Sequence, residues 1–118
     1  ARTVHPDAYN PLKDHPLLLP SYCVHSNNLN KLSEFLIKAR DGNVVVLTLH
    51  GVSDTEQYRV NTSKAHFLKL LKYLEEHDYT VIAMRDLNHY IDIKKAMKLI
   101  NLSDKIIRIA EINATPDY

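Results

Sequence analysis

The spacing of apolar positions predicts three helices in this chain. The first spans residues 29–40 and is capped by the polar residues at 26–28, with Gly42 placed to stop it. The second spans residues 62–77, capped by Asn61 or Thr62. Its expected buried stripe is Phe67, Leu68, Leu71 and Leu74. A third helix starts at Asp92, after a short turn over 87–91.

Two short runs between these helices have the composition of strands. Residues 44–49 are β-branched or apolar almost throughout, and residues 79–84 form a second run of this kind. Neither run alternates cleanly between polar and apolar residues, which favours strands that are buried on both faces, as in a parallel sheet.

Residues 1–28 read as a loop. Four of the five prolines lie in this segment, and each one fixes φ and removes a backbone donor. Leu17, Leu18 and Leu19 lie between two of these prolines and favour a short extended piece. Either the segment is a functional loop at an active-site face, or it is an element separated from its packing partner.

The predicted fold is therefore α/β, with a loop over 1–28, an αβαβα order over 29–100 and a tail over 101–118. Strands that alternate with helices favour right-handed parallel units. Two parallel strands alone would leave two hydrophobic sheet edges unpaired. We therefore expect the chain to be part of a larger domain, with further strands upstream.

Composition restricts the functional classes only moderately. A formal net charge of +1, from 15 basic and 14 acidic residues, gives no reason to expect nucleic acid or an anionic membrane as partner. No apolar run approaches the roughly 20 residues that a membrane-spanning helix needs. Cys23 is the single cysteine, so no internal disulfide can form, and with His25 it supplies too few ligands for a zinc site.

His50 is the leading candidate for chemistry. It follows the best predicted strand and precedes Gly51, and parallel α/β enzymes place their active sites at the carboxyl ends of strands. An imidazole at such a place suits proton transfer, because its pKa lies near neutrality. The alternative is a structural histidine that hydrogen-bonds a loop carbonyl.

The residues around His50 resemble a known enzyme family. The run Val44-Val45-Val46-Leu47-Thr48-Leu49-His50-Gly51-Val52-Ser53-Asp54, followed by the helix at 67–74 and the run at 79–87, is similar to the last motif of the polysaccharide deacetylases of the NodB-homology type. The similarity covers residues 43–91 and implies the C-terminal part of a (β/α) barrel.

The resemblance implies a metal-dependent hydrolase that removes acetyl groups from N- or O-acetylated glycans, with zinc as the usual ion. His50 then corresponds to the general acid that protonates the leaving amine. Thr48 stands where the family often has a leucine that lines the acetyl-methyl pocket, and Gly51 stands where many members have aspartate. Such enzymes act in the cell envelope or outside the cytoplasm.

Arg2 and Asp54 are further candidates for substrate binding. Arg2 is placed to end a strand at the same face, or else it is a plain surface arginine; Asp54 either contacts substrate or hydrogen-bonds its own loop. The family's Asp-Asp and His-x-x-x-His motifs do not occur in this sequence. We therefore expect no metal to be held by this segment and no turnover by it alone. The alternatives are a glycan-binding domain without catalysis and a small α/β interaction module whose strands pair in a homo-oligomer.

Overall fold

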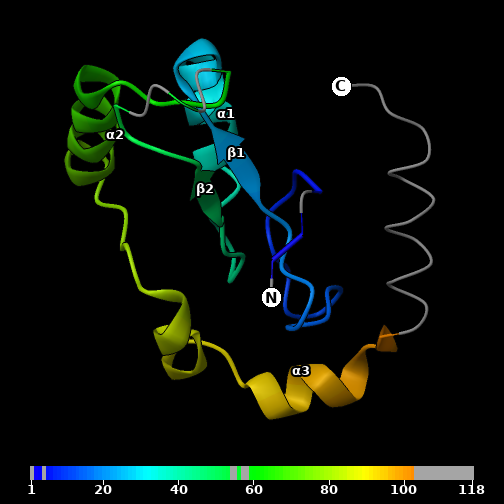
Figure 1. The fold of residues 1–118 in the computed structure, drawn as a ribbon. Helices are drawn as coiled ribbons and strands as arrows, with labels where there is room; N and C mark the ends of the chain where they lie inside the picture. The colour runs from blue at the N-terminus through cyan, green and yellow to red at the C-terminus, as the bar shows by residue number, and fades with distance from the viewer. Residues whose placement is uncertain (1, 4, 54–55, 57–58, 103–118) are drawn as a thin grey trace.

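The computed structural model describes residues 2–3, 5–53, 56 and 59–102. Two short strands, β1 (Tyr22–Val24) and β2 (Leu47–Leu49), form a parallel sheet (Figure 1). Their register pairs Tyr22 with Leu47, Cys23 with Thr48 and Val24 with Leu49. The described part of the chain is thus a small mixed α/β structure with a two-stranded sheet and several helices.

The first predicted helix is shorter and less regular than expected. A 3₁₀ helix, η1 (Ser26–Lys31), leads into α1 (Leu32–Leu36), and the helical hydrogen bonding ends near Ile37. Leu32 and Leu36 are the buried residues of α1, as the apolar spacing predicts. Gly42 has a φ of 81°, a left-handed conformation that glycine adopts without strain, and it turns the chain toward β2.

The second and third helices begin close to their predicted starts. The helix α2 (Lys64–Glu76) is capped by Ser63, whose hydroxyl accepts the His66 N–H at 3.2 Å, rather than by Asn61 or Thr62. The helix α3 (Ile93–Leu99) is capped by Asp92, as predicted. A second 3₁₀ helix, η2 (Met84–His89), lies between them.

Two predictions about strands are wrong. Residues 22–24, inside the segment read as a loop, form β1, because four prolines before Ser21 do not prevent the proline-free run that follows from pairing. Residues 79–84 form no strand, because a strand requires a hydrogen-bonded neighbour and residues 79–83 pair with no strand in the described part of the chain. The 3₁₀ helix η2 begins at Met84, at the end of this run.

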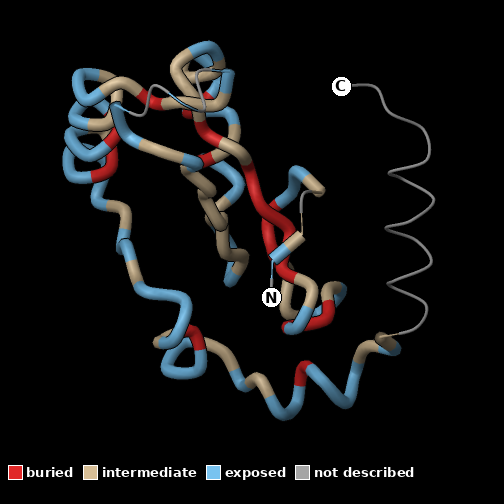
Figure 2. The backbone as a smooth tube through the Cα atoms, viewed as in Figure 1, coloured by how far each residue is buried: buried red, intermediate tan, exposed pale blue. Residues whose placement is uncertain are grey.

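The two faces of residues 44–49, the run that ends in β2, pack against separate hydrophobic clusters. Val45, Leu47 and Leu49 contact the first cluster, whose buried members are Val24, Leu32, Leu36, Leu70 and Leu74. Val44 and Val46 contact the second, which contains Tyr9, Leu19 and Leu87. This alternation is the period of a strand, but residues 44–49 are half-buried rather than buried on both faces as predicted. Figure 2 shows that burial is concentrated along the chain that leads into β1, whereas much of α2 and α3 is exposed.

No helix within the described residues is long and apolar enough to cross a bilayer. The predicted tail begins at 101, and its residues 103–118 lie outside the part of the chain that the structure describes.

Candidate functional site at the carboxyl end of the sheet

A histidine directly follows each of the two strands. Because Val24 pairs with Leu49, the next residues, His25 and His50, leave the sheet at the same level. The sequence alone points only to His50, because β1 is not predicted. The run Tyr-Cys-Val-His at 22–25 is the signal that would have found the second histidine, since it repeats the strand-then-histidine pattern of residues 47–50.

The two histidines differ in their surroundings. The His50 side chain is exposed and has no hydrogen bond, ion pair or ring contact among the described residues. The His25 backbone N–H donates to Asn28 Oδ1 at 3.0 Å, and the Nδ1 atom of its ring is buried without a hydrogen-bond partner in this part of the chain. Among the described residues, the His50 side chain therefore makes no bond to a loop carbonyl, which was its structural alternative.

A hydrogen-bonded frame supports this end of the sheet. Thr62 Oγ1 donates to the Val24 carbonyl at 3.2 Å, and the Thr62 N–H donates to the Gly51 carbonyl at 3.0 Å. The Ser63 N–H donates to Ser26 Oγ at 3.0 Å. Thr62 is fully buried. The frame ties the loop after each strand to the start of α2 and holds the backbone on either side of His50.

Thr48 lies two residues before His50, so strand alternation places the two side chains on the same face. Strand alternation directs Thr48, Cys23 and Val46 away from the first hydrophobic cluster. The Thr48 hydroxyl is buried and has no hydrogen-bond partner among the described residues. A buried hydroxyl without a partner loses its hydration free energy, so it is a candidate contact for a ligand.

The structure does not bring Arg2 to His50, and it does not describe Asp54. Arg2 pairs through an isolated parallel bridge with Leu19, before β1 begins, and this places its backbone toward the amino end of the sheet. Its guanidinium is near enough to Cys23 to oppose the rise in the thiol pKa that burial causes. Asp54 lies outside the described residues.

The described residues do not supply a metal site. No group of three or more histidine, cysteine, aspartate or glutamate side chains in this part of the chain is placed to hold an ion. Structural and catalytic zinc sites need at least three protein ligands. The residues present therefore do not fit the metal that the family resemblance implies.

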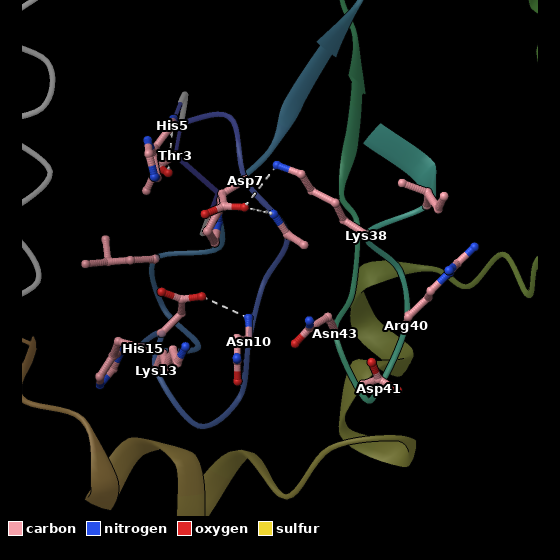
Figure 3. Close-up of a pocket in the computed structure, with 15 residues that line it drawn as sticks. Thr3, His5, Asp7, Asn10, Lys13, His15, Lys38, Arg40, Asp41 and Asn43 are labelled. Atoms are coloured by element: carbon pink, nitrogen blue, oxygen red, sulfur yellow. Dashed lines mark hydrogen bonds and ion pairs between the residues drawn. The ribbon is translucent and has the colours of Figure 1, made fainter. Parts of the chain in front are cut away.

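A pocket in the described part of the chain lies at the opposite end of the sheet. Figure 3 shows this cavity of about 500 Å³ between the loop before β1 and the turn after α1. Lys38 reaches across it to Asp7 Oδ1 at 3.7 Å, and the Asn10 N–H donates to Asp14 Oδ2 at 2.8 Å. The lining has three cationic residues and three carboxylates, Lys13, Lys38, Arg40, Asp7, Asp14 and Asp41.

This balance of charge gives the pocket no preference for an anionic or a cationic ligand. The Lys38 ammonium also lies 5.7 Å from the centre of the Tyr22 ring, which stacks on Phe35 at 4.2 Å. The pKa of Lys38 is raised, chiefly by the Tyr22 hydroxyl and further by Asp7. Lys38 therefore contacts both Asp7 in the pocket wall and Tyr22 of β1, and the Tyr22 ring in turn stacks on Phe35 of α1.

The comparisons with known proteins identify no relative. No protein-family model matches the chain, and neither a curated protein nor a solved structure is significantly similar to it.

Proposed function

We propose that the chain is the C-terminal part of a carbohydrate deacetylase in which His50 is the proton donor. The observation that supports this proposal is an exposed histidine, without a competing partner among the described residues, directly after a parallel strand. The carboxyl ends of parallel strands are the usual position of catalytic groups in α/β enzymes. The resemblance of residues 43–91 to the deacetylase motif supplies the substrate class.

The proposed step is a single proton transfer. When the C–N bond of the tetrahedral intermediate breaks, the electron pair remains on the sugar nitrogen, and the His50 imidazolium gives its proton to that nitrogen. The products are the free amine and acetate. Thr48, whose hydroxyl is buried without a described partner, lies two residues before His50 and would contact the acetyl group. No step is assigned to a metal, because the described residues do not form a site for one.

The test uses the longer protein that contains this chain and measures acetate release from N-acetylglucosamine oligomers. We expect His50→Ala to lower kcat by about 10²- to 10⁴-fold, the usual range for a general acid. His25→Ala is the matched control, because it also follows a strand at this end, and it should retain most of the activity. Equal activity of His50→Ala and the parent protein would contradict the proposed role.

Two other outcomes would change the functional class. A folded protein that binds the oligomers without releasing acetate would be a glycan-binding domain. A folded protein that neither binds nor hydrolyses them would leave the interaction module as the remaining reading of the fold.

A further inference from the structure

The sheet has a free edge along β2. The Tyr22 N–H donates to the Val46 carbonyl at 2.9 Å, and this register directs the backbone groups of Val46 and Thr48 toward β1. The amides and carbonyls of the odd-numbered residues, Val45, Leu47 and Leu49, consequently point to the other side. Within the part of the chain that the structure describes, they have no hydrogen-bond partner. Such an edge is a template for another strand.

The same chain contains a strand-like segment without a sheet. The Tyr79 N–H donates to the Leu74 carbonyl, and the Ala83 carbonyl accepts the Asp86 N–H. Between these two bonds, residues 80–82 have no backbone hydrogen bond to any described residue. Ala83 is extended, with φ −73° and ψ 146°, and the Val81 side chain is 72% exposed. Threonine, valine and isoleucine at 80–82 favour the extended conformation that Ala83 adopts.

The free edge and the free segment are not paired with each other within one molecule. Figure 1 shows α2 on the β2 side of the sheet and the chain from α2 to η2 running away from the sheet. On α2, Leu68 and Leu71 are 54% and 45% exposed, so apolar surface is available on this side of the molecule. A strand from another molecule could therefore hydrogen-bond to the unpaired backbone groups of β2 and pack against the apolar side chains of α2.

We propose that residues 79–83 of one copy pair with the free edge of β2 in a second copy, and that the exchange is reciprocal. Among the described residues, the β2 edge and residues 80–82 both lack backbone partners, so two copies can satisfy both by a reciprocal exchange. Because the chain itself supplies the strand that the edge lacks, a second copy is favoured over an unrelated peptide. The inference does not depend on the deacetylase proposal, because it rests on backbone pairing and uses none of the chemistry proposed for His50.

The first experiment measures the mass of the 118-residue chain by size-exclusion chromatography with light scattering. We expect twice the chain mass of 13.6 kDa at tens of micromolar. Val81→Pro removes a backbone donor from the exchanged segment and Val81→Lys places a charge in it, so both should give monomers. Val81→Thr keeps the donor and the β-branch and should remain dimeric. Circular dichroism establishes that each variant is folded, and Val81→Lys serves if Val81→Pro does not fold.

The second experiment identifies the pairing. In a mixture of isotope-labelled and unlabelled chains, filtered NOE spectra should show contacts between residues 45–49 of one chain and 79–83 of the other. A monomer at every concentration, a dimer that survives both Val81→Pro and Val81→Lys, or contacts confined to a single chain would each overturn the proposal.

Discussion

At the scale of single residues, His25 and His50 occupy equivalent positions in the strand register but differ in how available their side chains are for chemistry. His25 and His50 follow paired residues, yet the backbone of His25 is held by Asn28, whereas the side chain of His50 is exposed and unbonded in the described structure. His25, the residue after β1, is the N-cap of the 3₁₀ helix η1, whereas no helix follows His50 directly. The difference between the two histidines therefore comes from the elements that follow them.

Cys23 provides a prediction at this scale. Burial raises the pKa of its thiol, and the nearby positive charge of Arg2 opposes that rise. Since the thiolate is the reactive form, alkylation by iodoacetamide should reach half its maximal rate at a higher pH than for free cysteine. Arg2→Ala removes the opposing charge and should move this midpoint to a still higher pH.

The control for Arg2→Ala is Arg85→Ala, because Arg85 is an exposed arginine that lies near Asp86. Arg85→Ala should leave the alkylation profile unchanged. If Arg2→Ala lowered the midpoint or left it in place, Arg2 would not influence Cys23 in solution.

At the scale of elements, α2 gives a matched pair of leucines. Leu70 is 3% exposed and packs in the first hydrophobic cluster, whereas Leu71 is 45% exposed. Leu70→Ala should lower the free energy of unfolding by about 2–4 kcal/mol, because it removes a buried side chain and leaves a cavity. Leu71→Ala should change it by about 0.5 kcal/mol or less, since alanine is the better helix former.

Urea unfolding followed by circular dichroism measures both leucine variants. The two changes are identical in chemistry and adjacent in sequence, so each is the control for the other. Equal losses would mean that α2 packs through the face that contains Leu68 and Leu71, and the described packing would then be incorrect.

The same helix shows how far the sequence predicts the fold. Its existence follows from the apolar spacing, although its cap is Ser63 and not Asn61 or Thr62. The predicted buried stripe is correct for Leu74 but wrong for Leu68 and Leu71, which are exposed, and it omits Leu70, because tertiary contact decides which apolar face of the helix packs. Asp92 is identified correctly as a cap because capping is a local interaction.

Strand pairing depends on residues far apart in the sequence, and for this reason the prediction of the strands fails. Residues 22–24 and 79–83 have similar strand propensities, yet only the first finds a neighbour in the structure. For the candidate site, the sequence identifies the strand that ends at His50 and the position of Thr48. It does not reveal His25, because β1 is unpredicted, or the location of Arg2, because its bridge to Leu19 is tertiary.

At the scale of the whole molecule, both hydrophobic clusters meet at residues 44–49, the run that ends in β2. Val45, Leu47 and Leu49 contact the first cluster, and Val44 and Val46, which precede β2, contact the second. Side-chain packing is thus distributed over both faces of this run, while backbone pairing of β2 among the described residues is confined to one edge. Around β2, side chains pack on both faces of the chain, whereas backbone groups along one edge of the strand lack hydrogen-bond partners among the described residues.

This asymmetry predicts an alternating pattern of amide hydrogen exchange in β2. The Thr48 amide points toward β1 and should be protected at every protein concentration, whereas the Leu47 and Leu49 amides should exchange rapidly in dilute protein. If a second copy supplies the missing strand, the Leu47 and Leu49 amides should gain protection as concentration rises, together with amides in residues 79–83.

Exchange followed by NMR at several concentrations, with Val81→Lys as the control, makes this measurement. The variant should abolish the concentration dependence and leave Thr48 protected, because the β1–β2 ladder does not involve residue 81. Concentration-independent protection of Leu47 would instead place a strand of the same molecule along this edge, and the sheet would then be completed within one chain.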